Sequence, residues 1–194
     1  MKTFKHTVVY LILLLGALVM VFPFFWMLVS SLKTAAEVNT TPPTFWPQNL
    51  MFENYSYAFE KAPFLLYFKN SVLVTISCVA LTVFTTILAA FAFSRLKFPG
   101  RDLLFSLLLA MMMIPFEILI ITNYTTVVKM GLIDTLVALI IPFTSSIFYT
   151  YILRNFFLSI PDSLYYSARV DGANNWRYLW RIMVPIAKPA LVTI

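Results

Sequence analysis

Long apolar stretches, separated by short polar segments, dominate this chain. Four of them reach the roughly 20 residues that a helix needs to cross a bilayer core about 30 Å thick. They cover residues Val8–Val29, Ser71–Ser94, Leu103–Thr122 and Thr135–Leu153. A fifth begins near Ile182 and reaches Ile194, which is too short to cross. The pattern predicts one all-α domain over residues 1–194, a polytopic membrane helix bundle with four spanning helices and the start of a fifth.

A secretory signal peptide is an alternative interpretation of the first stretch, because Lys2 and Lys5 precede its apolar run. The stretch has 22 residues without a charge. The apolar region of a signal peptide is usually shorter, at about 7–15 residues. Bulky residues from Pro23 to Trp26 also stand where cleavage needs small ones. We therefore expect a retained helix.

Composition agrees with a membrane protein and excludes several other classes. Hydrophobic residues make up 61% of the chain and charged residues 11%, which is well below the charge of a soluble domain. The single cysteine, Cys78, and the single histidine, His6, exclude an internal disulfide and a Cys/His zinc site. The four glycines form no phosphate-binding loop. We therefore expect neither an enzyme nor a bound cofactor, so any ATP would bind to another chain.

The distribution of charge predicts the orientation in the membrane. One side would hold the N-terminus, residues 95–102 and the residues from Arg154 onward, with ten Lys and Arg against three Asp. The other side would hold four Lys against four acidic residues. An excess of Lys and Arg marks the cytoplasmic side. The N-terminus and the segment after 154 are therefore expected in the cytoplasm, and the net charge of +6 does not call for nucleic acid.

The longest external segment covers residues 32–70. Three prolines in residues 40–47 (TTPPTFWP) exclude a helix there. Residues Phe52–Lys61 predict a short surface helix with Phe52, Tyr55 and Phe59 on one face. That face is either an aromatic anchor at the membrane surface or a contact for an external partner protein.

Small residues recur at spacings of three and four in the second and fourth stretches. Such stripes mark either closely packed helix faces or, in part, a polar pathway. Glu117, two residues after Pro115, is the only charge within the four stretches. An intramembrane carboxylate indicates function by default, although a structural role bonded to a kinked carbonyl is the alternative. The candidates for pathway or packing are Glu117, Thr75, Thr82 and Ser145.

Residues 154–182 form the most distinctive segment. Ser159, Pro161 and Asp162 predict the start of a helix over Asp162–Asp171, with Ser159 as its cap. Gly172 supplies the left-handed stop. Asn174 or Asn175 then caps a second helix that runs until Pro185. A rigid elbow of this kind can transmit force, whereas the alternative is an ordinary interfacial hairpin.

At this point the sequence resembles a known family. The run Tyr166–Gly172, followed by nine residues and then Ile182–Pro185, is similar to the EAA motif of ABC importer permeases. Ala168, Gly172, Ile182 and Pro185 match the motif, while Tyr166 replaces its Glu, Ser167 its first Ala and Val184 its Leu. Further similarity, to the second permease subunit of the maltose-type carbohydrate importers, lies in Ser30–Lys33, Glu53–Tyr55, Asn70–Ser71, Phe91–Leu104, Met112–Pro115 and Ser159–Leu164.

The resemblance implies a subunit of a sugar transport system in the bacterial inner membrane. Its partners would be a second permease subunit, two cytoplasmic ATPase subunits and an external solute-binding protein. The elbow would dock on an ATPase subunit, with Ala168 allowing close packing and Gly172 making the corner. Because Tyr166 offers only a hydroxyl and a ring, docking would depend more on packing, Arg169 and Asp171.

The resemblance also implies that the C-terminal part is missing, because the family normally has more spanning helices than this chain. Two other functions stay open. The chain could serve the same machinery for another solute, such as a peptide or an anion. It could also be a membrane anchor or assembly protein without a transport role.

Overall fold

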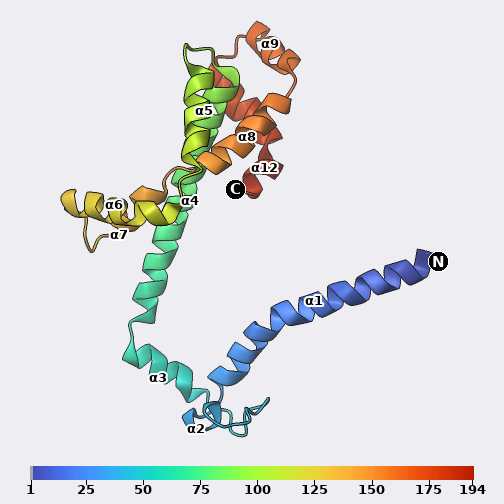
Figure 1. Cartoon of the computed structure of the whole chain (residues 1–194), viewed down its shortest axis with the longest axis vertical. Helices are drawn as coiled ribbons and strands as arrows, with labels where there is room; N and C mark the ends of the chain where they lie inside the picture. The colour runs from blue at the N-terminus through green and yellow to red at the C-terminus, as the bar shows by residue number, and fades with distance from the viewer. Residues whose placement is uncertain (1) are drawn as a thin grey trace. The chain divides into compact units, whose positions relative to one another are not determined.

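The computed structural model describes the backbone of residues 2–194 and the side chains of residues 6–115 and 117–194. The chain divides into two compact units, residues 1–67 and 68–194. The described residues contain helices and no strands, as predicted. Figure 1 shows the order of the helices along the chain.

The first unit contains α1 (Lys2–Ser31), α2 (Ala35–Val38) and α3 (Glu53–Lys61). Within α1, His6–Ser31 is long and apolar enough to cross a membrane, and none of its apolar window is buried inside the protein. This confirms a helix over the first apolar stretch. The prediction of a short helix ending at Lys61 is also confirmed, and residues 40–47 are not helical.

The segment between α1 and α3 is folded through polar contacts. Thr34 and Glu37 form a capping box at the start of α2. The Glu37 carboxylate also accepts a 2.6 Å hydrogen bond from the Gln48 backbone N–H. This bond, with a second from the Thr34 N–H, lowers the pKa of Glu37 below its ordinary value. The buried Lys33 ammonium donates to the Thr44 carbonyl and lies 4.4 Å from the centroid of the Trp26 ring.

The second predicted span lies on α4 (Phe64–Arg95), which is long and apolar enough to cross a membrane. The helix begins at Phe64, seven residues before the predicted Ser71. Residues 64–70 of the segment predicted to be external are therefore helical. Lys69 is the one charge near the start of this helix, and long Lys side chains reach the membrane surface without ending a helix.

The third predicted span, Leu103–Thr122, is interrupted at Pro115 by more than a kink. The structure has two helices here, α5 (Arg101–Met111) and α6 (Phe116–Lys129). Pro115 separates them with an extended backbone (ψ 135°). Proline has no N–H to donate to the carbonyl four residues back, and it disfavours helical geometry in the residue before it.

The fourth predicted span is bent. It consists of α7 (Leu136–Ile140), the 3₁₀-helix η1 (Ile141–Phe143) with Pro142, and α8 (Ile147–Ser159). The two parts meet at 45° and together are long and apolar enough for one span. The described residues thus hold two helices able to cross a membrane, or three with this bent pair. The four spans and the start of a fifth that the sequence predicts are not confirmed.

The C-terminal segment is a series of short helices. It contains α9 (Asp162–Val170), α10 (Asn175–Tyr178), the π-helix η2 (Leu179–Met183), α11 (Val184–Ile186) and α12 (Lys188–Val192). The helix predicted to stop at Pro185 continues past it. Pro185 cannot donate to the Arg181 carbonyl, and the widened π-turn directly before it accommodates that missing bond.

The core of the second unit joins α4, α8 and the C-terminal helices. It holds Ile87, Ala90, Phe91, Leu153, Phe157, Ile160, Ala168, Ala173, Tyr178, Leu179, Met183 and Ala187. Figure 1 shows α9 at the end of this unit that also carries the connection between α4 and α5. The elbow segment therefore belongs to the packed core and is not a loose appendage.

Candidate functional site

The start of α9 differs from the predicted capping by Ser159. Ser159 is the last residue of α8, and its hydroxyl donates to the Phe156 carbonyl at 2.7 Å. Pro161 occupies the cap position of α9 without a side-chain hydrogen bond. Asp162 is the first helical residue, where the positive end of the helix dipole favours its charge.

Arg95 connects this corner to α4. Its Nη2 donates to the Phe157 carbonyl at 2.7 Å and to the Ile160 carbonyl at 2.5 Å. Its Nη1 donates to the Asp162 carboxylate. The Arg95 side chain is only 8% exposed. A helix leaves its last carbonyls without intrahelical partners, so this guanidinium caps the end of α8 and fixes the start of α9 at once.

The C-terminal end of α9 turns as predicted. Gly172 has a φ of +75°, the left-handed conformation that favours glycine. The Ala173 N–H donates to the Ala168 carbonyl at 2.9 Å, and the Gly172 N–H to the Arg169 carbonyl at 3.1 Å. Beyond the corner, the Asn174 side chain accepts a 2.8 Å hydrogen bond from the Arg177 N–H and so caps α10. The elbow geometry therefore has hydrogen-bonded ends on both sides of the corner.

The two faces of α9 differ in exposure. Ala168 is only 5% exposed and belongs to the buried core of this chain, so its small side chain allows α9 to pack on its own chain. Tyr165 lies on the same inward side, with its ring 5.0 Å from that of Tyr178. The opposite face is exposed and carries no charge. It consists of Ser163, Tyr166, Ser167 and Val170.

The remaining motif residues lie away from that outer face. Arg169 Nη1 donates to the Ala173 carbonyl at 3.3 Å, so it supports the corner, while Asp171 is exposed at the end of α9. Ile182 is half-buried against the core within η2. Pro185 is exposed in α11. The motif thus combines core, corner and surface positions and does not form one patch.

A basic groove of about 670 Å³ runs beside α9. Arg95, Lys97 and Arg101 contribute from the connection between α4 and α5, and Asp162 and Tyr166 from α9. Tyr165 also lines the groove, and its ring lies 5.0 Å from that of Tyr178. The Tyr178 side chain is fully buried, and this burial raises the pKa of its hydroxyl. The groove places Lys97, which is exposed, next to the outer face of α9.

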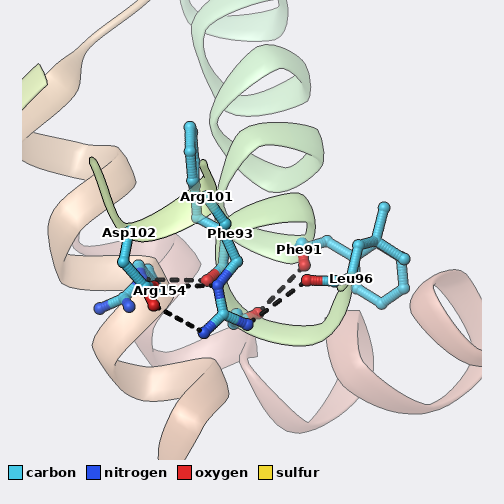
Figure 2. Close-up of polar contacts among 7 residues, drawn as sticks. Phe91, Phe93, Leu96, Arg101, Asp102 and Arg154 are labelled. Carbon is cyan, nitrogen blue, oxygen red and sulfur yellow. Dashed lines mark hydrogen bonds and ion pairs between the residues drawn. The ribbon is translucent and has the colours of Figure 1, made fainter. Parts of the chain in front are cut away.

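Two further arginines secure the same end of the unit (Figure 2). Arg154, on α8, donates through Nε to the Phe93 carbonyl of α4 at 3.2 Å, and its guanidinium lies 4.1 Å from the centroid of the Phe105 ring of α5. Arg101 pairs with Asp102 at 3.0 Å and lowers the pKa of that carboxyl. The end of the unit that carries α9 is thus braced across α4, α5 and α8.

The sequence did not reveal the role of Arg95 or Arg154. Both counted only as positive charges on the cytoplasmic side. Their partners are backbone carbonyls about sixty residues away along the chain, and no side-chain pattern marks a carbonyl as an acceptor. The available signal was that Arg95 ends a long apolar helix, where a cation is favoured by the helix dipole.

Of the four pathway or packing candidates, two lie together. Thr82 and Ser145 line one hollow of about 770 Å³ beside the break between η1 and α8. Thr75 is exposed on α4 and Glu117 is exposed in the first turn of α6, and neither lines that hollow. Glu117 makes no hydrogen bond to the residues that the structure describes, so the expected bond to a kinked carbonyl is not seen.

The small-residue stripe of α4 packs against the broken fourth segment. Thr82 donates to the Phe143 carbonyl at 2.6 Å, and Thr85 to the Thr144 carbonyl at 2.7 Å. The Cys78 thiol lies 3.8 Å from the Leu139 carbonyl. These contacts favour the packing interpretation for Cys78, Thr82 and Thr85, although Cys78 and Thr82 also line the hollow.

Comparison with known proteins identifies the family. Residues 82–194, more than half of the chain, match the model of the family described as the binding-protein-dependent transport system inner membrane component. The chain belongs to this family. Together with the apolar helices α1 and α4, this assigns the chain to the inner membrane, which it crosses more than once.

Two relatives and one solved structure illustrate the similarity. The diacetylchitobiose uptake system permease protein NgcG of Streptomyces coelicolor is 31% identical over 94% of this chain. The sulfoquinovosyl glycerol transport system permease protein SmoH of Agrobacterium fabrum is 35% identical over 89%. The chain spans 61% of the length of each relative. The chain is also similar to a chain in the crystal structure of a bacterial ABC transporter involved in the import of the acidic polysaccharide alginate. The match covers all of this chain and 68% of the transporter chain, with 26% sequence identity and a TM-score of 0.85.

Proposed function

We propose that this chain serves as the transmembrane permease subunit of a binding-protein-dependent ABC importer for a sugar or oligosaccharide. Membership of the transport family supports the permease role. The names of the two relatives, which refer to a chitobiose derivative and a glycosyl glycerol, support a carbohydrate as the solute. The polysaccharide in the description of the structural neighbour agrees with them. In this proposal the chain is not catalytic, and separate ATPase subunits hydrolyse ATP.

The observation that carries the proposal is the rigid attachment of α9. Arg95 binds the end of α8 and the start of α9, while the Gly172 corner and Ala168 hold the rest of α9 on the core. A helix fixed in this way moves with α4 and α8. Closure of an ATPase dimer against α9 would therefore turn the membrane helices and switch the pathway between its inward-open and outward-open states.

The exposed face of α9 indicates how it would dock on an ATPase subunit. Tyr166 is 63% exposed and Val170 is 88% exposed, and Ser167 lies between them. The face is uncharged, so we expect a docking groove lined by apolar and aromatic groups around Tyr166. Arg169 and Asp171, at the end of the helix, would supply charge only at the margin of this contact.

For this function we propose a topology of four spanning segments and the start of a fifth. The bent pair α7–α8 would be one span, and α5 with α6 another that is broken at Pro115. The N-terminus and α9 would lie in the cytoplasm, and the segment between α1 and α4 outside. The ten Lys and Arg against three Asp on the proposed inner side support this orientation.

A solute pathway would pass the hollow beside the break between η1 and α8. Thr82 and Ser145 line it, together with Asn123 and Tyr149, so it offers hydroxyl and amide groups that suit a sugar. Thr75 and Glu117, outside its lining, are weaker candidates. The partners required are a second permease subunit, two ATPase subunits and an external solute-binding protein.

Co-purification and uptake test the function. The chain expressed with its neighbouring transport subunits should retain a stoichiometric ATPase, and proteoliposomes should import a carbohydrate only with ATP and the binding protein. A membrane anchor without a transport role would bring down no ATPase. Import of a peptide or an inorganic anion through the same complex would show that the solute class, and not the permease role, is wrong.

A further inference from the structure

The helix α3 is tied to the ends of both apolar helices that flank it. The Tyr55 hydroxyl lies 2.6 Å from the Ser31 hydroxyl at the end of α1. Asn54 Nδ2 donates to the carbonyls of Ser31 and Lys33, both at 2.9 Å. At its other end, the Phe59 ring lies 5.7 Å from the ring of Phe64, the first residue of α4. The helix α3 is therefore held between the last turn of one apolar helix and the first turn of the next.

One face of α3 is aromatic and uncovered. Phe52, Tyr55 and Phe59 follow the three-and-four spacing of a helix face, and they are 65%, 45% and 56% exposed. Glu53 and Glu60 lie together on another side, more than a quarter-turn away. Tyr55 and Phe59 are also the residues that contact Ser31 and Phe64. The aromatic face is thus the one directed toward the spanning helices.

A second aromatic contact reaches further along α1. The Phe45 ring lies 5.8 Å from that of Trp26, and the Trp46 ring lies 5.7 Å from that of Phe25. Phe25 and Trp26 precede the end of α1 by more than one turn, in its apolar part, and both are half-buried. The loop before α3 therefore returns to the apolar helix α1 through two aromatic contacts.

From these contacts we infer that α3 lies in the headgroup region of the bilayer, with Phe52, Tyr55 and Phe59 inserted toward the acyl chains. Aromatic side chains favour this zone, and an amphipathic helix lies in its plane with the apolar face down. The occupant of the aromatic face is lipid and not an external protein, which would meet the side that carries Glu53 and Glu60. The inference depends on the spans α1 and α4 and not on the proposed transport.

Spin-label accessibility tests this placement in the full chain, in vesicles of phosphatidylethanolamine and phosphatidylglycerol. Cys78→Ser removes the native thiol and keeps a hydroxyl donor. Single cysteines are then introduced as Phe59→Cys on the aromatic face and Glu60→Cys as the matched control. We expect the ratio of oxygen to nickel-complex accessibility to be several-fold higher for the label at position 59 than for the label at position 60.

Phe52→Cys, which does not touch α4, provides a second site in case the loss of the Phe59 ring disturbs the Phe64 contact. Lipid-like accessibility at both aromatic sites supports the inference. Equal water accessibility at positions 52, 59 and 60 would overturn it. Protection of the aromatic sites that appears only after the external binding protein is added would also overturn it, because that result assigns the face to a protein partner.

Discussion

Arg95 and Asp162, which are 67 residues apart, form an ion pair that joins the last residue of α4 to the first residue of α9. The same guanidinium satisfies two carbonyls at the end of α8, so one side chain fixes three helices at the corner from which α9 projects. Asp162 is 73% exposed, and the carbonyl contacts are therefore the better protected part of this arrangement.

Replacing Arg95 should weaken this corner and separate ATP hydrolysis from transport. Arg95→Gln removes the charge and most of the donors, and a hydrogen bond to a charged group contributes roughly 1.5–3 kcal/mol. We expect a loss of about 2 kcal/mol in stability. We also expect hydrolysis in the assembled transporter to continue with reduced uptake. Thermal unfolding and uptake by proteoliposomes measure the two effects.

Arg101→Gln is the matched control, because Arg101 lies on the same connection but pairs with its neighbour Asp102. Its effect on stability should be small. Asp162→Asn should fall between the two, since it removes the ion pair and leaves the carbonyl contacts of Arg95 in place. Normal coupling in Arg95→Gln would argue against a transmitting role for this corner.

Substitution of Gly172 should lower stability because of its backbone conformation and not because of steric contacts. A Cβ there would meet nothing within 4 Å, but the φ of +75° is unfavourable for other residues. Gly172→Ala should therefore cost about 1 kcal/mol. Gly172→Pro should cost more, because it also removes the N–H that donates to Arg169. Gly16→Ala, within α1, should be neutral or stabilising, and denaturation of the three variants in detergent compares them.

Substitutions at Ala168 and Val170 distinguish the packing of α9 on its own chain from its docking on an ATPase subunit. Ala168→Leu inserts a larger side chain into the core and should destabilise the chain by about 1–3 kcal/mol. Val170→Asp changes the most exposed position of the outer face, so it should leave stability unchanged and weaken association with the ATPase subunit. Thermal unfolding and co-purification distinguish them. If Val170→Asp retained the ATPase fully, the uncharged face of α9 would not be the docking surface.

Protonation of Glu37 in acid should lower the stability of the segment between α1 and α3. Its ordinary pKa of 4.5 is lowered in the folded protein by hydrogen bonds from Gln48 and Thr34. A carboxyl with a lowered folded pKa stabilises the fold above its unfolded pKa, and this contribution is lost as the pH falls through the folded value. Tryptophan fluorescence should therefore change on acidification.

Glu37→Gln should remove most of that acid dependence, since the amide does not titrate. Glu60→Gln, on the exposed side of α3, is the control and should leave the acid transition unchanged. An identical acid transition in Glu37→Gln and the unchanged protein would show that another group controls it.

The apolar pattern predicted the two long helices well, because a run of about 20 apolar residues needs no partner to specify its structure in lipid. The Gly172 corner was equally predictable from local chemistry. The break at Pro115 was not, because a proline in a membrane helix either kinks it or ends it, and neighbouring helices decide between these outcomes.

The sequence could not predict which face of α9 turns toward its own chain, for a different reason. The motif directs attention to Ala168 as a contact for a partner, whereas Tyr165 and Ala168, three residues apart, both lie on the side of the helix that meets the core. Which side of a short amphipathic helix faces its own chain depends on the elements that receive it. Here one of these elements is α10, whose Tyr178 ring lies 5.0 Å from that of Tyr165.

Cysteine cross-linking from α9 in the assembled transporter tests the central claim most directly. In the Cys78→Ser background, Tyr166→Cys and Val170→Cys should each form a cross-link to an ATPase subunit in the cytoplasm, and the yield should change with ATP. Ala168→Cys, which is buried, should form none. Absence of any link from positions 166 and 170, or their labelling by an impermeant reagent from outside the cell, would contradict the account.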